Sequence, residues 1–244
     1  MRKYGISTGT ISHDFMQAFT LFHDLAEVGY IKAVELSALR MHELWPLLKL
    51  LTGMCGPPLD LRPFEHVSVH APTKFSAEEE RELAAVLQVL VPPHIPVVVH
   101  AEDISVPARW EGLGDRLYIE NADRRKITGK FCRSFEELFT ALPKAKLCFD
   151  IAHAYNVDCS MHEALRFVNM FRDRIAEVHV SGITEDRHAT HIPLTRRMAE
   201  IYYHVCYFIA DTVPIISESP LDVADYRSSA IASLIPMTLT SSSA

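Results

Sequence analysis

The sequence lacks an apolar run near the roughly 20 residues that a membrane-spanning helix needs. Its first residues, MRKYGISTGT, begin with basic side chains but are not followed by the apolar stretch of a secretory signal. Low-complexity sequence is confined to a Ser-rich tail at 241–244, which we expect to be disordered. We therefore predict a cytoplasmic protein with a single domain over 1–240 and no membrane partner.

The sequence also lacks paired cysteines and an excess of basic residues. Its five cysteines show no CxxC spacing, and an odd number argues against a disulfide framework. The formal net charge of −7 provides no overall attraction to nucleic acid, so any phosphate contact would need a local basic patch. By contrast, the chain has 13 histidines, a residue that serves as an acid or base near pH 7 and as a metal ligand.

Short runs rich in Val and Ile alternate with amphipathic stretches of helical periodicity, a pattern typical of βα units around a parallel sheet. Eight strands are predicted, at 3–8, 33–38, 66–70, 96–100, 116–121, 146–151, 176–181 and 214–219. Helices are predicted at 15–29, 41–53, 76–90, 134–142, 161–171 and 195–210. With 244 residues, this pattern predicts an α/β fold of one (β/α)8 TIM barrel.

Local signals mark where several of these helices begin and end. Ser76 precedes a Glu-rich first turn, while Ser134 and Ser160 are each followed three residues later by Glu, as in a capping box. Gly53, followed by two prolines, marks the end of the second helix. These signals predict N-terminal caps at the three serines.

Active sites of this barrel lie at the C-terminal ends of the strands. From the third strand to the eighth, every predicted strand ends in or next to a metal-ligand type, and the residues are His70, His100, Glu120, Asp150, His179 and Glu218. Such a run has a chance probability below about one in a hundred for strand ends in this fold. Carboxylates held together near apolar walls repel one another unless a cation neutralises them, so the pattern predicts a metal site.

Three further residues extend this set. His153 follows Asp150 with D-x-x-H spacing, and Asp186 and His188 form D-x-H in the loop after the seventh strand. Mixed imidazole and carboxylate ligands suit Zn²⁺, Mn²⁺ or Fe²⁺ better than Mg²⁺ or Ca²⁺. Nine ligands exceed the need of one ion, so we expect two or three ions, Zn²⁺ first among them, bridged by a carboxylate such as Glu120.

In these positions the sequence resembles the xylose-isomerase-like barrel superfamily, and within it the endonuclease IV family (AP endonuclease family 2). The resemblance runs along nearly the whole chain. It implies three zinc ions held by the nine residues named above, with the DRH triplet at 186–188 and Glu218 inside ESP matching family motifs. Loops that contact DNA in that family differ here, since ENADRRK replaces its glycine-rich turn and APTKF follows His70.

The resemblance implies a metal-dependent hydrolase in which a metal-activated hydroxide cleaves a phosphodiester, with abasic DNA as one candidate substrate. Glu120 and Glu218 are then the catalytic carboxylates, and the expected substrate-binding residues are Lys74, Arg124, Arg187 and His191. The alternative is a sugar or sugar-phosphate isomerase or epimerase with one metal ion and Glu120 and Glu218 as its acid/base pair. The partner is thus a phosphate-containing or sugar substrate, and the sequence does not predict an oligomeric state.

Overall fold

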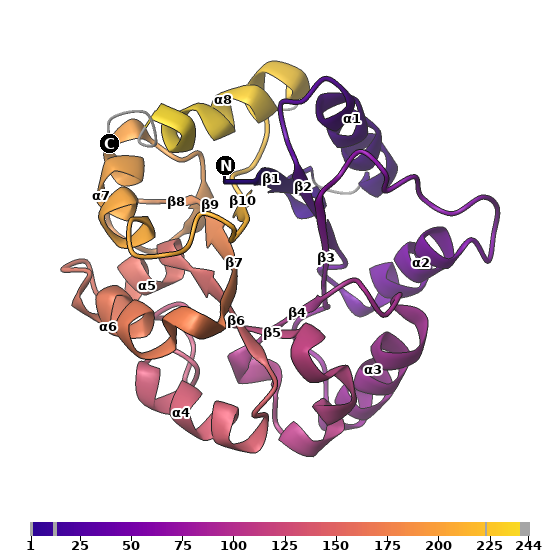
Figure 1. Cartoon of the computed structure of the whole chain (residues 1–244), viewed down its shortest axis with the longest axis horizontal. Coiled ribbons are helices and arrows are strands. Elements are labelled where there is room, and N and C mark those ends of the chain that lie inside the picture. Colours follow the sequence, from indigo (N-terminus) through magenta and orange to yellow (C-terminus); the bar gives the residue numbers. More distant parts are fainter. Residues whose placement is uncertain (1, 12–13, 223, 240–244) are drawn as a thin grey trace.

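The computed structural model describes residues 2–11, 14–222 and 224–239, so the tail expected at 241–244 lies outside the described residues. Eight parallel strands close into a barrel in the order β1-β10-β7-β6-β5-β4-β3-β2, which confirms the predicted TIM barrel (Figure 1). The barrel strands are β1 (Tyr4–Ser7), β2 (Ala33–Ser37), β3 (His66–His70), β4 (Val97–His100), β5 (Leu117–Glu120), β6 (Lys146–Asp150), β7 (Ile175–Val180) and β10 (Ile215–Ser217).

Helices surround the barrel as an outer ring (Figure 1). They are α1 (Phe15–Glu27), α2 (Met41–Thr52), α3 (Ala77–Leu90), α4 (Cys132–Ala141), α5 (Ile151–Val157), α6 (His162–Phe171), α7 (Arg196–Cys206) and α8 (Tyr226–Leu239). Short 3-10 turns are η1 (Thr8–Thr10), η2 (Ala101–Asp103), η3 (Pro107–Arg109), η4 (Glu111–Arg116) and η5 (Arg172–Arg174). In the described part of the chain, none of the helices has both the length and the apolarity to cross a bilayer.

Two of the predicted helix boundaries are correct. The Ser76 hydroxyl accepts a hydrogen bond from the Glu79 amide, and the Glu79 carboxylate accepts one from the Ser76 amide, which completes a capping box before α3. Gly53 adopts the left-handed conformation, with φ of 75°, and ends α2.

The predicted caps at Ser134 and Ser160 are wrong. Helix α4 begins earlier, at Cys132, because the buried carboxylate of Glu163 accepts the Cys132 amide at 2.8 Å and so caps this helix from α6. At the start of α6 the Glu163 amide is bound by the Asp158 carboxylate at 3.0 Å, and Ser160 donates its hydroxyl to the same aspartate. The carboxylates of Glu163 and Asp158 thus cap these two helices, while the Ser160 hydroxyl accepts the His162 amide at a long 3.4 Å.

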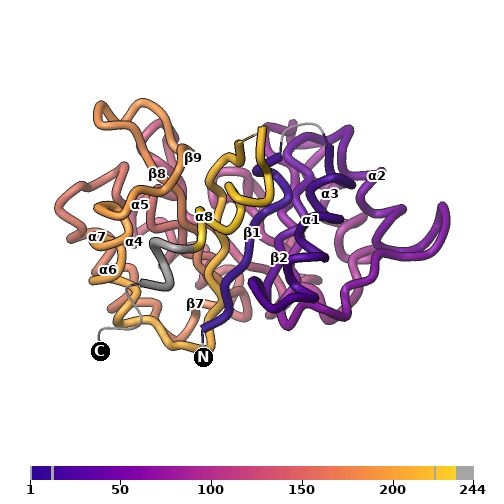
Figure 2. The backbone as a smooth tube through the Cα atoms, turned by 90° about the horizontal axis from the view of Figure 1, so that it is seen from above, coloured from indigo at the N-terminus to yellow at the C-terminus, as the bar shows by residue number. Residues whose placement is uncertain are grey.

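Two elements that the sequence pattern did not predict follow the barrel strands directly. Helix α5 starts at the residue after β6, and β8 (Gly182–Ile183) pairs with β9 (Thr190–Ile192) in an antiparallel hairpin after β7. Figure 2 shows this hairpin at the end of the molecule opposite the N-terminus. Both elements therefore lie at the C-terminal ends of the strands, where the predicted metal ligands are found.

The apolar core lies mainly between the strands and the helices. Phe135 on α4, for example, packs edge-on against Phe167 on α6, with ring centroids 5.1 Å apart. Along each strand, every second side chain faces the helices and the others point into the barrel. Many of the side chains that point into the barrel are polar. On β3 the buried serine Ser68 lies between His66 and His70, and on β7 Glu177 and His179 are completely buried. Polar groups therefore run down the barrel axis beneath the strand ends.

Candidate metal centre

The fold brings together the ligand types that end consecutive strands. His70, His100, Glu120 and Asp150 are the last residues of β3, β4, β5 and β6. His179 is the next-to-last residue of β7, and Glu218 directly follows β10. The register places His100 beside Glu120 and Asp150 beside His179 on neighbouring strands.

Glu120 lies at the centre of this cluster. Its Oε2 atom is 3.0 Å from His70 Nε2, 3.2 Å from His100 Nε2 and 3.8 Å from His179 Nδ1. Its other oxygen, Oε1, is 3.3 Å from His153 Nδ1. A single buried carboxylate is thus surrounded by four imidazoles.

Several sets of residues around Glu120 have the spacing of metal ligands, including two that consist of predicted ligands only. One is His70, His100 and Glu120, and the other is Glu120, Asp150, His179 and Glu218. In each set one nitrogen or oxygen atom per residue lies within 4.8 Å of the corresponding atoms of the others. Because Glu120 belongs to both sets, the arrangement matches the predicted bridging role of this residue.

The histidines are oriented by hydrogen bonds on the nitrogen that faces away from the cluster. His70 donates from Nδ1 to the Ala71 carbonyl at 2.9 Å, and His179 donates from Nε2 to the Glu177 carboxylate at 3.0 Å. Since carbonyl and carboxylate oxygens only accept, these outer nitrogens carry protons. Loss of the proton on the inner nitrogen would then leave a lone pair on Nε2 of His70 and on Nδ1 of His179 for a metal ion. Such bonds to the outer nitrogen are typical of metal-binding histidines.

Buried polar atoms without partners show that a cation fits here. In the described part of the chain, Asp150 Oδ2, His179 Nδ1 and Glu218 Oε2 are buried and accept no hydrogen bond. The other oxygen of Asp150 accepts the His153 amide at 2.7 Å and so caps α5, which fixes the carboxylate in place. Two carboxylate oxygens and an imidazole nitrogen that face one another without a proton donor form a set suited to a divalent ion.

The shifted pKa values point to the same conclusion. Burial raises the pKa of Glu218 to about 8, and the nearby Glu120 carboxylate adds to this effect. Burial lowers the pKa of His153, but the carboxylates of Asp150 and Glu120 outweigh it and raise the pKa to about 9. The site thus holds more negative charge than it can neutralise by itself without binding protons, and a metal ion would replace those protons.

A second layer of buried polar residues lies beneath the cluster. His179 Nε2 faces two carboxylates, Glu177 at 3.0 Å and Glu35 at 3.1 Å, and both side chains are completely buried. Glu177 also accepts the Ser68 hydroxyl at 3.1 Å and forms an ion pair with His66. Neither Glu177 nor His66 was among the residues predicted from the sequence. Glu177 lies two residues before His179 and His66 four residues before His70, and this even spacing along a strand places them on the same inward face.

The predicted substrate-binding residues lie in loops around this end of the barrel. Arg124 and Arg187 come from two different loops that Asn156 joins, since its side chain accepts the Arg124 amide at 3.1 Å and donates to the Arg187 carbonyl at 2.9 Å. Lys74 is exposed in the loop after β3. His191 lies nearest the cluster, with its Nδ1 atom 3.6 Å from Glu218 Oε2.

Asp186 and His188 lie in the turn of the β8–β9 hairpin and are exposed, outside the buried cluster. The Asp186 carboxylate accepts hydrogen bonds from the Thr184 hydroxyl and from the His188 amide. The His188 ring lies 3.3 Å from the Arg124 guanidinium. Seven of the nine predicted ligands therefore gather in one buried cluster, and these two are placed apart from it.

No protein-family model and no curated protein matches the sequence. Solved structures do match in fold. Endonuclease IV from Thermus thermophilus is 18% identical with a TM-score of 0.61, covering 99% of this chain and 100% of that one. An L-ribulose 3-epimerase is 12% identical with a TM-score of 0.60 (99% and 96%). The 3-DHS dehydratase AsbF from Bacillus anthracis, described as probable, is 14% identical with a TM-score of 0.56 (99% and 100%).

These structures, all below 25% identity, show that the chain shares their fold, and they show nothing beyond the fold. They include a nuclease, an epimerase and a dehydratase, which carry out different reactions. The reaction of this chain must therefore be argued from its own residues.

Proposed function

We propose that the chain is a divalent-metal-dependent hydrolase of phosphate esters, with two ions that share Glu120. The observation that supports this is the position of Glu120 Oε2, which lies 3.0 and 3.2 Å from the imidazoles of His70 and His100 and 3.8 Å from that of His179. A site for one ion needs only the four ligands from β5, β6, β7 and β10. The paired histidines of β3 and β4 provide for a second ion.

Two divalent ions, when bound, would lower the pKa of a water molecule and offset the charge of a phosphate group. The residues of the chain would hold and orient the reacting groups. Glu177 and Glu35 keep the Nδ1 atom of His179 directed at the cluster. Glu218, whose Oε2 atom lies between the rings of His179 and His191, would orient the attacking water.

The proposed substrate carries a phosphate ester. Arg124 and Arg187 would bind its phosphate oxygens, because guanidinium groups offer two parallel N–H donors. Asn156 fixes the backbones of both arginines relative to each other. Lys74 and His191 would contact the more distant part of the substrate, for which an abasic site in DNA is our first candidate.

A sugar epimerase or isomerase is the second candidate. It is favoured by the exposed position of Asp186 and His188, because the cluster of Glu120, Asp150, His179 and Glu218 is complete without them. In this alternative one ion would bind the sugar oxygens, while Glu120 and Glu218 would transfer a proton on either side of the reacting carbon. His70 and His100 would then have no ligand role.

The decisive experiment compares His100→Ala with His94→Ala, an exposed histidine before β4, in the Zn²⁺-, Mn²⁺- or Fe²⁺-loaded protein. Hydrolysis of bis(p-nitrophenyl) phosphate and of a duplex with one abasic site would be measured beside proton exchange on L-ribulose. The proposal predicts that the rate of hydrolysis falls at least about tenfold in His100→Ala, as expected for loss of a ligand, and stays unchanged in His94→Ala. Proton exchange without hydrolysis, unchanged in His100→Ala, would favour the epimerase.

A further inference from the structure

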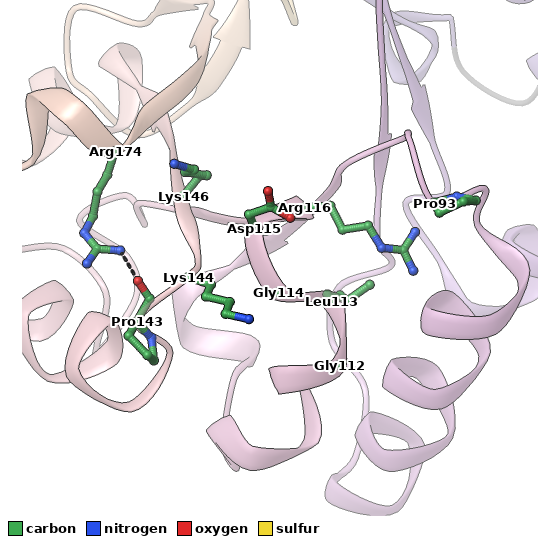
Figure 3. A pocket seen from close by; sticks show the side chains of 10 residues that line it. All are labelled: Pro93, Gly112, Leu113, Gly114, Asp115, Arg116, Pro143, Lys144, Lys146 and Arg174. Carbon is green, nitrogen blue, oxygen red and sulfur yellow. Dashed lines mark hydrogen bonds between the residues drawn. The ribbon is translucent and has the colours of Figure 1, made fainter.

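A hollow of about 840 Å³ lies at the end of the barrel where the chain enters the strands, away from the metal centre. Figure 3 shows the side chains that line it. Its lining comes from the segments that lead into the strands. Arg116 directly precedes β5, Lys146 opens β6 and Arg174 directly precedes β7. Lys146 and Asp150 stand at opposite ends of the same strand, about 13 Å apart at the usual rise per residue. This hollow is therefore separate from the metal centre.

The lining of this hollow is strongly basic. It contains Arg116, Lys144, Lys146 and Arg174 but only one acidic residue, Asp115. The excess of positive charge contrasts with the formal net charge of −7 for the whole chain. A concave site of this volume falls within the range of small-molecule pockets. We call it the basal basic pocket.

Both arginines are held in place by backbone carbonyl oxygens. Arg174 donates to the carbonyls of Pro143 and Ala145 at 2.8 and 2.9 Å, and its guanidinium stacks on Phe139, 4.7 Å from the ring centroid. Arg116 donates to the Gln88 carbonyl at 2.8 Å and to two further carbonyls. Carbonyl oxygens orient a guanidinium group without cancelling its charge, so an anion would meet cations that are already ordered.

The two lysines have no such partners. Among the residues that the structure describes, neither Lys144 nor Lys146 forms an ion pair. Figure 3 shows both side chains, together with Asp115, between Arg174 on one side and Arg116 on the other. The pocket thus combines two fixed guanidinium groups with two ammonium groups that lack a counter-ion.

We propose that the basal basic pocket binds a small anion with two or more phosphate groups, of the pyrophosphate class. Four cations distributed over one hollow exceed the charge of a single phosphate, and the guanidinium fork matches phosphate oxygens. An extended nucleic acid would bring its charge against the acidic remainder of the protein, whereas a small anion would contact the pocket alone. This site is independent of the function proposed for the metal centre.

The test is calorimetric titration of the full chain with inorganic pyrophosphate, and with sulfate at matched ionic strength. We expect Lys144→Ala/Lys146→Ala to weaken pyrophosphate binding by about 100-fold, roughly tenfold for each charged donor. Lys49→Ala, an exposed lysine on α2, should bind as the wild type does. Sulfate should bind much more weakly than pyrophosphate.

Pyrophosphate also binds metal ions, so a Glu120→Gln variant completes the design. Binding that survives in Glu120→Gln and is lost in the double lysine variant supports the basal basic pocket. Binding that is lost in Glu120→Gln and kept in the double lysine variant would place the anion at the metal centre and overturn the proposal. Lack of binding at millimolar pyrophosphate would overturn it as well.

Discussion

Replacing Glu177 with glutamine tests whether the buried layer beneath the metal centre controls metal affinity. The Glu177 carboxylate is completely buried, accepts the His179 Nε2–H at 3.0 Å and accepts the Ser68 hydroxyl at 3.1 Å. Glutamine has nearly the same shape and keeps one oxygen that can accept from His179. The substitution therefore removes a negative charge that pairs with His66 and makes the His179 ring a stronger ligand.

The expected size of the effect follows from this geometry. Loss of a carboxylate partner of a metal-binding histidine weakens metal binding by about 10–100-fold, or about 1.4–2.7 kcal/mol. Glu35 lies 3.1 Å from the same Nε2 atom and remains in place, so we expect a value at the lower end of this range. Removing the charges of Glu35 and Glu177 together should weaken metal binding by about 100-fold or more, the upper end of the same range.

Metal affinity would be measured by competition with a coloured chelator, and folding by circular dichroism. Glu163→Gln is the matched control, because Glu163 is also a buried glutamate that accepts a backbone amide, but it caps α4 far from the cluster. Both variants should lose some thermal stability, and only Glu177→Gln should lose metal affinity. A folded Glu177→Gln protein that binds metal like the wild type would refute the reasoning.

Three further predictions concern the scaffold. Glu80→Ala should lower the free energy of unfolding in urea by about 3–5 kcal/mol, because its buried carboxylate accepts hydrogen bonds from amide, indole and guanidinium donors. Burial raises the pKa of Glu80 but these bonds outweigh it and hold the pKa below the usual value, so its contribution is present above about pH 4.3. The difference in free energy of unfolding between the wild type and Glu80→Gln should accordingly disappear as acid protonates Glu80. A difference that persists would contradict this. Gly5→Ala should cost at least about 1–3 kcal/mol, seen as a lower melting temperature, since an added Cβ would lie 2.4 Å from the Ala33 carbonyl oxygen. Asn156→Ala should speed hydrogen exchange of the Arg124 amide, and unchanged exchange would disprove the role given to this side chain.

The barrel and the convergence of the candidate ligand side chains could be predicted because both depend on local patterns. Alternating apolar strands and helices specify the βα units, and the strand ends then converge whatever the detailed packing. His70, His100 and Glu120 could be recognised for this reason, each as the last residue of its strand. The early start of α4 could not be predicted, because its cap comes from Glu163 on another helix.

Side-chain direction in the loops is the part that the sequence pattern did not resolve. His188 and His191 lie three residues apart in the hairpin, yet His191 faces Glu218 whereas His188 is exposed. His191 and Arg187 adopt left-handed backbone conformations, with φ of 56° and 59°, which no motif signals for these residue types. Contacts across the barrel, such as that between Glu35 and His179, depend in the same way on the register of the closed sheet.

The number of metal ions per chain tests the central claim most directly. Elemental mass spectrometry of the purified protein and of His100→Ala would count them, with protein concentration determined on the same samples. Our account predicts two ions per chain in the wild type and one in His100→Ala, because the second set of ligands remains intact. A single ion in both proteins would contradict the shared role of Glu120 and the two-ion centre.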